Sequence, residues 1–582
     1  MDKQGITVVA LCIFALVIWE YKFAPKYTPP PVPPAASQAE VASNRPQLAA
    51  GTPSPQPVSA QPSTTTGTDQ QTPDETPVPL KNETVGTPSV EYVFTNIGGG
   101  ISRAALLNHI AENDLKVTLN QHGTFPIGAL SVLPGEGANV AYTVSSGSGA
   151  VVCQRSLPNQ VVLTKTFSLP TTRTQPEAYI TNLNVTFKNN GSKPFETGSY
   201  YVYTGASSRI HETDRRDYTA FDWCHGGKAT EISTLWFEPG KIPFLGIQTS
   251  SGKTSYTATS DGILWAGVLS QYFATLISTT DKHAKEVWAQ RLSIPTDNPD
   301  QPLPAIEGAI GMPGFKLAPG ESYSQQFKIY TGPKDFGNLE KLGNGENDIM
   351  HYRMFGFMNI SIVSRTLLWS MNRLEGIFRS YAIAIIVLTL IIKTGMWPLQ
   401  NASTRSMKKM QALQPKLKEF QEKYKEDPAR LNQETMKLYK DYGVNPLSGC
   451  LPMFVQIPIF FGFYSMLGTA IELRNSHFLW VKDLSQPDTL FFISHFPVNV
   501  LPLCMAATMV WQMSLTPKTG DPAQQRMMMF IPLIFISFCY NFASALALYW
   551  TVQNLFSIVQ LYLTRNQTAP VLQKLSPPRK KR

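Results

Sequence analysis

Long apolar runs separated by polar segments are the main feature of this sequence. One run near the N-terminus covers Gly5–Trp19, and the C-terminal half contains four more, at 381–399, 450–467, 498–513 and 527–563. As a helix, the run at 381–399 would rise about 28 Å at 1.5 Å per residue, enough to cross the hydrocarbon of a bilayer. The last run is too long for one span, and Asn541-Phe-Ala-Ser544 in its middle predicts a tight hairpin of two short helices. The pattern therefore predicts an α-helical bundle of six transmembrane helices.

The first run, within residues 1–26, has two interpretations. It is either a transmembrane anchor or a cleaved signal peptide. Glu20, Tyr21 and Lys22 follow it without small residues at cleavage-site spacing, so the anchor is favoured. Residues 27–90 are rich in Pro, Ser, Thr, Gln and Ala, a composition that buries too little apolar surface to become ordered. We expect a disordered linker that does not hold the following domain rigidly.

Residues 91–345 have the two-residue period of β-strands. Tyr179, Leu183 and Phe187 alternate with polar neighbours, and Gly, Pro and Asn-Gly punctuation separates such runs. The run 263–269 is apolar throughout, as in a strand buried on both faces. The sequence predicts an all-β domain of sandwich type.

Residues 355–378 have a helical period. The apolar positions lie on one side, at Ile360, Val363, Leu367, Met371 and Leu374. An amphipathic helix directly before a span either lies in the membrane interface or docks on its own domain. The sequence leaves both possibilities open.

The placement of charge predicts the topology. The chain has 50 Lys+Arg and 41 Asp+Glu, a net charge of +9. Basic residues concentrate in 402–442 and in the tail at 566–582, whereas 472–497 has only Arg474 and Lys482. The positive-inside rule then puts both termini and the basic segments in the cytoplasm, with the β domain outside. The basic charge also indicates anionic lipids and the ribosome as partners, whereas no motif indicates DNA binding.

The basic segment 402–442 is predicted to be a cytoplasmic helical hairpin. Pro415 is expected to interrupt its first helix. Asp427-Pro428 fits the N-cap and first position of the second helix, and Gly443 fits its C-cap. The apolar seam, which is expected to pack on the second helix or to receive substrate, consists of Met407, Met410, Leu413, Leu417 and Phe420.

No catalytic or metal-binding pattern is found in the sequence. Ser251-Gly-Lys-Thr254 lacks the first glycine of a phosphate loop and precedes a strand-like run. The eight histidines are scattered, without zinc-site spacing. We therefore expect neither an enzyme nor a cofactor. Cys153 and Cys224 could pair if the β domain faces an oxidising compartment, which the sequence alone does not decide.

Polar residues within the apolar runs are the best candidates for function. A charged side chain such as Lys393 is costly in hydrocarbon. The other candidates are Gln456, Gln553, Asn554, Ser557 and Gln560. We favour a shared polar groove, because residues 553, 557 and 560 share one helical face. The alternatives are snorkelling for the lysine and separate interhelical hydrogen bonds for the amides.

Four stretches resemble one known family, the YidC-type membrane protein insertases. Residues 445–458 (NPLSGCLPMFVQIP) and 521–532 (DPAQQRMMMFIP) resemble the entries to that family's third and fifth spans. Residues 413–416 (LQPK) resemble its cytoplasmic hairpin, and 270–275 (SQYFAT) resemble a strand of its periplasmic β super-sandwich. The resemblance is dense from about 350 to 565 and weaker from 91 to 340.

The resemblance implies a five-helix insertase core at 379–565, in addition to the N-terminal anchor, in a bacterial inner membrane. It implies that the protein inserts nascent membrane proteins, alone or beside the Sec translocon. It also implies a cytoplasm-facing hydrophilic groove with a positive residue, usually arginine, on the second span, where this chain has Lys393. The alternative is a solute transporter with an external β-sandwich binding domain, but the internal repeat typical of transporters is not seen in the sequence.

Overall fold

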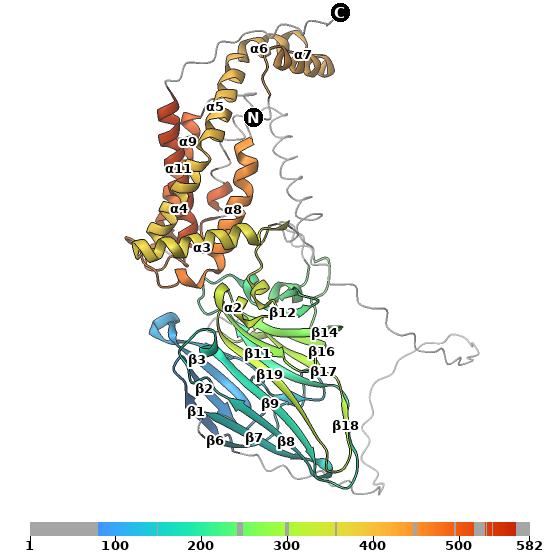
Figure 1. The fold of residues 1–582 in the computed structure, drawn as a ribbon. Helices are drawn as coiled ribbons and strands as arrows, with labels where there is room; N and C mark the ends of the chain where they lie inside the picture. The colour runs from blue at the N-terminus through green and yellow to red at the C-terminus, as the bar shows by residue number, and fades with distance from the viewer. Residues whose placement is uncertain are drawn as a thin grey trace, which may run out of the picture.

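The computed structural model describes residues 79–565 except for 148, 241–247, 297–301, 355–357, 446–450, 494–495, 517–529, 531, 533 and 538. A β domain and a helical core are joined end to end (Figure 1). The predicted N-terminal anchor at 1–26, the linker up to residue 78 and the basic tail at 566–582 lie outside the described residues.

The β domain begins with a four-stranded antiparallel sheet, earlier than expected. Its order is β1 (Asn82–Gly86), β2 (Val90–Thr95), β3 (Gly100–Ile110) and β4 (Lys116–Leu119). Assigning 82–86 to the linker was wrong, because β1 pairs with β2 along its whole length. β1 has the sequence NETVG and none of its residues is buried. Sequence pattern alone does not distinguish such a polar edge strand from a polar linker.

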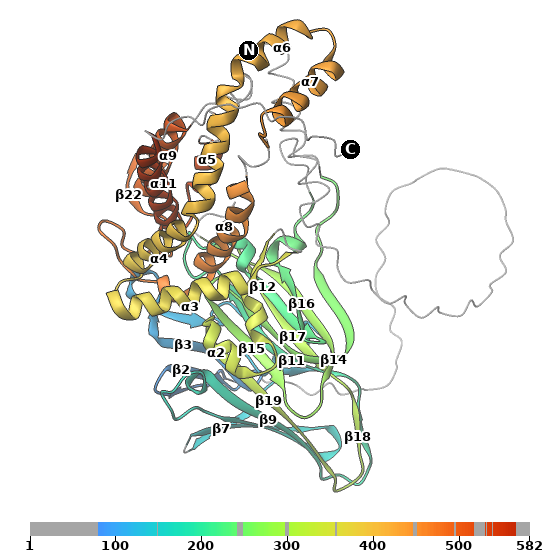
Figure 2. The ribbon, with the colours of Figure 1, turned by 45° about the horizontal axis from the view of Figure 1, so that its top comes forward.

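A second sheet of 13 strands forms most of the domain (Figure 2). Its main path runs β5-β11-β17-β16-β14-β15-β19-β9-β8-β7-β6, and β12 and β13 extend it beside β14. The remaining strands of the domain are β5 (Leu130–Ser131), β6 (Thr143–Gly147), β7 (Ala150–Leu157), β8 (Val161–Ser168), β9 (Ile180–Asn189), β10 (Phe195–Thr197), β11 (Tyr200–Ser208), β12 (Ala220–His225), β13 (Lys228–Ser233), β14 (Ser255–Leu269), β15 (Phe273–Thr279), β16 (Ala284–Ile294), β17 (Leu303–Met312), β18 (Phe315–Leu317) and β19 (Ser322–Pro333).

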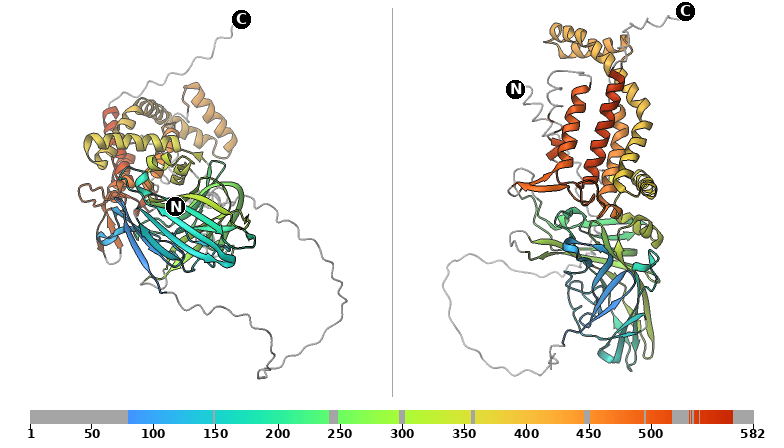
Figure 3. Two further views of the ribbon diagram at one scale, coloured as in Figure 1. Left: turned by 60° about the horizontal axis from the view of Figure 1, so that its bottom comes forward. Right: turned by 90° about the vertical axis from the view of Figure 1, so that its left-hand side faces the viewer.

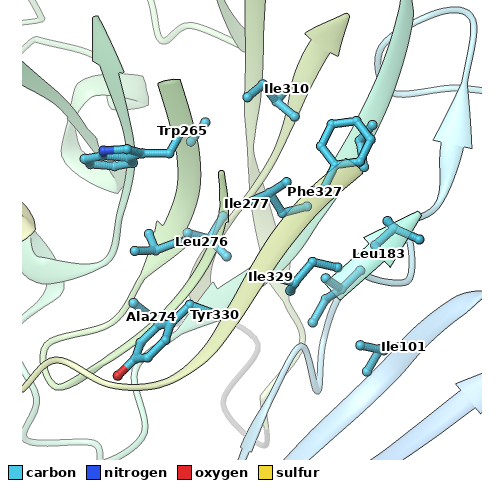
Figure 4. Packing of buried hydrophobic residues seen from close by; sticks show 14 of the residues in the cluster. Ile101, Leu183, Trp265, Ala274, Leu276, Ile277, Ile310, Phe327, Ile329 and Tyr330 are labelled. Atoms are coloured by element: carbon cyan, nitrogen blue, oxygen red, sulfur yellow. The ribbon is translucent and has the colours of Figure 1, made fainter. Parts of the chain in front are cut away.

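The predicted strand patterns are confirmed in the core of this domain. In β9, Thr181, Leu183 and Val185 are buried, as the two-residue period requires. β14 is buried on both faces from Trp265 onward. Figure 4 shows Trp265 and side chains of β15 and β19, such as Ile277 and Ile329, in the same cluster.

The expected end of the β domain at residue 345 is too early. After β19, helix α2 (Phe336–Leu342) and a 3₁₀ turn (Glu346–Met350) follow. Ile349, Met350 and Tyr352 are buried in the core of the β domain. A short hairpin, β20 (Arg353–Met354) with β21 (Met358–Asn359), then leads to the helices.

The predicted amphipathic helix is α3 (Ser361–Phe378), which lies across the ends of α4 and α8 (Figure 1). Its buried side includes Leu367 and Met371, as expected. This side packs on the helical core, where Ser364 Oγ donates to the carbonyl of Gly462 at 3.2 Å. The opposite side exposes Ile362, Trp369 and Ile377.

The helical core contains α4 (Tyr381–Gly395), α5 (Trp397–Ala412), α8 (Leu451–Thr469), α9 (Val500–Leu515) and α11 (Ser544–Arg565). By length and hydropathy, α8 qualifies as a membrane span among the described residues, and α4 with α5 forms a second candidate only if the bent pair is one span. Helix α9 is apolar but shorter. The number of six spans therefore remains a prediction.

The predicted second span at 381–399 is not one straight helix. α4 ends at Gly395, α5 begins at Trp397, and the two axes differ by 56°. Pro398 explains the break, because proline lacks the N–H that would donate to Thr394 and its ring disfavours helical geometry before it.

The last apolar run also differs from the prediction of two short helices. The chain turns at 540–543, as expected, but the following helix α11 has 22 residues. A helix of this length rises about 33 Å. It continues past its polar residues because neighbouring helices bind them.

Candidate functional site

The predicted polar residues of the last span lie on the buried part of α11. Gln553, Asn554, Ser557 and Gln560 are each at most 8% exposed. Helix α11 packs on α4, α8 and α9, so its polar face is enclosed by the helices that flank it. Buried polar side chains require hydrogen-bond partners, which the surrounding helices provide.

A three-residue network joins α11 to α8. Gln456 Nε2 donates to Tyr549 Oη at 3.0 Å and to Gln553 Oε1 at 3.2 Å. The ring of Tyr549 stacks on Phe463 of α8, with 4.2 Å between the ring centroids. Sequence reasoning selected both glutamines but missed the tyrosine, whose hydroxyl gave no signal within an apolar stretch.

Two further contacts join α11 to α9 and α5. Asn554 Nδ2 donates to Thr508 Oγ1 at 3.1 Å, and Gln560 Nε2 donates to Asn401 Oδ1 at 3.4 Å. Ser557 Oγ donates to the carbonyl of Gln553 within its own helix at 2.9 Å. The amides thus form hydrogen bonds between helices, which was the alternative to a shared groove. Together, Gln553, Asn554, Ser557 and Gln560 form what we call the polar strip of α11.

Lys393 has a different environment. It lies in the last turn of α4, partly exposed, directly before the bend. The negative end of the helix dipole favours a cation at this position. In the described part of the chain, no hydrogen bond or ion pair joins its ammonium to the polar strip of α11.

A lysine that sequence analysis did not single out lies at the other end of the strip. Lys408 Nζ donates to the carbonyl of Thr564 at 2.8 Å. Thr564 lies in the last turn of α11, so this amine also stands at a helix C-terminus. This bond joins α5 to the C-terminal end of α11.

The predicted helical hairpin is present at the end of the molecule farthest from the β domain (Figure 1). Its helices are α6 (Gln414–Lys423), which begins after a break at Leu413, and α7 (Pro428–Asp441). Asp427 Oδ1 accepts from the backbone N–H of Arg430 at 3.0 Å, which confirms the predicted N-cap. Gly443 takes the left-handed conformation that a C-cap requires, with φ of +60°.

Most residues of the predicted seam lie in one small apolar cluster. Leu413 and Leu438 are buried at its centre. The residues packed against this centre are Met410, Leu417, Phe420, Tyr439 and Tyr442. Met407, which we expected in the seam, lies one turn too early in α5 to belong to this cluster.

The β domain is docked directly on the helical core, contrary to the loose attachment that its linker suggested. Gln271 Nε2 donates to the carbonyl of Gly468 at 2.7 Å, and Gln486 Nε2 donates to Asp214 Oδ1 at 3.1 Å. Arg474 donates to the carbonyl of Ile110 at 2.9 Å and lies over the Tyr272 ring, 5.2 Å from its centroid. These contacts between segments far apart in sequence could not be read from composition.

The two cysteines of the β domain are both free thiols in this structure. Cys153 and Cys224 are buried in different strands. Burial raises the pKa of each thiol to about 11, so both are neutral at physiological pH. They are structural core residues rather than a disulfide.

Comparisons with known proteins match the two parts of the chain separately. The family described as "60Kd inner membrane protein" matches residues 373–571, and the family "YidC periplasmic domain" matches residues 83–364. The described boundaries of the β domain and the helices agree with this division.

Whole-length relatives agree with both matches. "Membrane protein insertase YidC" of Syntrophus aciditrophicus (strain SB) is 31% identical over 589 residues, which cover 97% of this chain and 100% of the relative. The protein of the same name from Geobacter metallireducens is 31% identical, covering 96% and 97%. A solved structure described as "Active YidC insertase crystal structure with the first transmembrane domain resolved" is 20% identical, with a TM-score of 0.34, and the match covers 84% of this chain and 95% of that chain. The chain belongs to the YidC family of membrane protein insertases.

Proposed function

We propose that this chain inserts nascent membrane proteins into the inner membrane and helps them fold, using a hydrophilic groove that opens to the cytoplasm. The family supports the insertase activity. The observation that carries the groove is the buried polar strip of α11, together with the charge of Lys393 on α4. Polar groups of this kind inside a membrane bundle usually serve a pathway or a wet cavity.

The mechanism lowers the cost of moving a polar segment across hydrocarbon. Water beside the polar strip would reach part of the way into the bilayer. The hydrophilic tail of a client would then have a thinner layer of hydrocarbon to cross. Lys393 attracts acidic residues of that tail transiently, and α8 and α9 offer apolar surfaces to the client's span. The membrane potential adds about 2.3 kcal/mol per charge per 100 mV.

The topology that this mechanism requires follows the charges. The hairpin at 402–442 and both termini lie in the cytoplasm, and the β domain lies in the periplasm. Basic residues of the hairpin, such as Lys416, Lys423 and Arg430, then face anionic lipid headgroups and the ribosome. The protein acts alone or beside the Sec translocon. The proposal includes no bond-making step and no cofactor.

Crosslinking to a stalled nascent membrane protein tests the groove. Benzoyl-phenylalanine would replace Gln456, the partly exposed member of the polar network, with Val559 on the exposed side of α11 as the control. We expect client adducts at residue 456 and weaker adducts at residue 559. Equal adducts at both positions would place the client on the lipid face of the helices instead of in a groove.

A further inference from the structure

The loop between α8 and α9 contains an exposed apolar hairpin that the insertase function does not use. β22 (Thr489–Ile493, TLFFI) pairs with β23 (Phe496–Asn499). Each residue of β22 is exposed, and the large apolar ones are Leu490, Phe491, Phe492 and Ile493. Soluble surfaces rarely gather apolar side chains in this way, so the hairpin requires an occupant that covers it.

Hydrogen bonds hold the base of the hairpin against the helical core. Asn499 is fully buried, and its Nδ2 donates to the carbonyl of Tyr540 at 2.8 Å. Tyr540 Oη donates back to the carbonyl of Pro497 at 2.7 Å. Asp488 accepts the backbone N–H of Leu501 at 2.6 Å and the ring N–H of Trp480 at 3.0 Å. These bonds tie the ends of β22 and β23 to the residues around α9.

Its position is continuous with the helices that lie in the membrane. Asn499 leads without a break into α9, and Figure 2 shows β22 beside α9 and α11. In the right-hand view of Figure 3, the hairpin (orange) leaves the helices sideways at the end nearest the β domain, level with α3. At that level α3 also exposes apolar residues, including Trp369. Both elements thus border the same bilayer surface.

We propose that the β22–β23 hairpin inserts into the periplasmic leaflet and contacts lipid acyl chains near the headgroups. The described residues of the two strands contain no charged side chain, which suits lipid better than water. Within the part of the chain that the structure describes, the two strands pair only with each other, so their outer edges carry backbone groups outside the ladder. Such edges are not tolerated in the hydrocarbon centre, and this limits the insertion to the headgroup and acyl boundary. Trp480, with its ring N–H satisfied at the hairpin base, is typical of this interfacial zone.

Photocrosslinking in native membranes tests the proposal with the full-length protein. Benzoyl-phenylalanine would replace Phe492 (66% exposed) or, as a second site, Ile493. The matched controls are Leu133 on the β domain (61% exposed) and Val510 on α9 (57% exposed). We expect phospholipid adducts at residues 492 and 493 to be several-fold more abundant than at residue 133, and similar to those at residue 510.

Two results would overturn the proposal. One is a lipid yield at residues 492 and 493 no higher than at residue 133. The other is a dominant protein adduct at the hairpin, whether to a client, a translocon subunit or a second copy of this chain. Lipid adducts at residue 510 without any at the hairpin would leave the membrane position of the core intact, so this failure is distinct from a failure of the groove.

Discussion

Two lysines show how the surroundings of an amine decide what it does. Lys165 in β8 is fully buried and donates to the carbonyls of Gly98 at 2.6 Å and Gly128 at 3.0 Å. It also lies 4.3 Å from the centroid of the Tyr142 ring. Lys393 lies in the last turn of α4, directly before the break between α4 and α5. Among the described residues, no pair of backbone carbonyls accepts from its ammonium as for Lys165. The first lysine holds loops of the β domain together, and the second is proposed to meet a client.

Lys165 gives the stability of the β domain a predictable pH dependence. Burial lowers the pKa of its amine to about 7, whereas an unfolded lysine has a pKa of about 10.4. Between these values the unfolded chain binds more protons at this site, so the site makes stability rise with pH, by at most about 1.4 kcal/mol per pH unit. In Lys165→Met this contribution should vanish. Thermal unfolding of the β domain in the full-length protein at pH 7 and pH 9 measures it.

Lys188→Met, on the exposed side of the neighbouring strand β9, is the control for that measurement and should keep the native pH slope. An unchanged slope in Lys165→Met would mean that the amine is not deprotonated in the folded protein.

Substitution of Lys393 should order insertion yields as Arg ≥ Lys > Gln > Glu. Arginine keeps the charge at lower hydration cost, glutamine removes it, and glutamate repels acidic clients. A partly exposed ion pair worth roughly 1 kcal/mol corresponds to about a fivefold change. The measurement is insertion yield across clients with increasingly acidic translocated segments, with neutral-tailed clients as the control. If Gln and Lys gave the same yield across the whole series, Lys393 would only snorkel.

The sequence placed polar residues of α11 on one helical face but did not give their partners. The spacing of Gln553, Ser557 and Gln560 was enough for the first. The partner of Gln456, Tyr549, and the partner of Gln560, Asn401, were not foreseen. Which hydroxyl or amide on one helix bonds to a residue of another depends on how the two helices pack. A single sequence does not contain that information.

At the scale of elements, sequence periodicity located most helices but not the break between α4 and α5. The apolar run continues through Gly395 and Met396 to Trp397, so hydropathy shows no interruption there. The helix is nevertheless interrupted, because Pro398 removes a backbone hydrogen bond.

The polar edge strand β1 was also missed. It is held by backbone pairing and not by buried apolar side chains, so its sequence has no apolar pattern to recognise.

The helical hairpin depends on Leu413, the buried residue at the junction of α5 and α6. Leu413→Asp would leave an unpaired charge in its small core, which costs roughly 3–5 kcal/mol, more than so small a cluster can offset. We expect rapid proteolysis of 402–442 and reduced insertion, with the spans still in the membrane. Met436→Asp, at an exposed position of α7, is the control and should be almost silent. Native protease resistance in Leu413→Asp would show that this cluster does not hold the hairpin together.

At the scale of the whole molecule, the β domain and the helical core form one continuous structure. Contacts from 110 and 214 of the β domain reach the loop between α8 and α9, and the contact from 271 reaches Gly468 in the last turn of α8. Helix α3, which follows the β domain in the sequence, also packs on the helical core. The linker length suggested a loosely held domain, because a sequence shows covalent connections but not docking contacts.

Arg474 is the residue to change in this interface, because it is 8% exposed and combines a hydrogen bond with two aromatic contacts. Arg474→Met keeps the aliphatic stem but loses the charge, at a cost of about 2 kcal/mol. Calorimetry of the purified protein should then show the β domain unfolding separately from the helices, and protease should cut between them. Lys482→Met, exposed in the same loop, should behave like the native protein. A native calorimetric profile in Arg474→Met would place the docking energy elsewhere.

The docked interface also constrains how the protein itself is made. Synthesis runs from the N-terminus, so the β domain is complete before the loop after α8 has left the ribosome. Its docking face must wait in water, and it combines the rings of Tyr272 and Phe273 with polar residues such as Asp214, Arg215 and Gln271. A wholly apolar face would invite aggregation during that interval. The polar residues of this interface therefore suit a domain that is completed first and receives its helical partner afterwards.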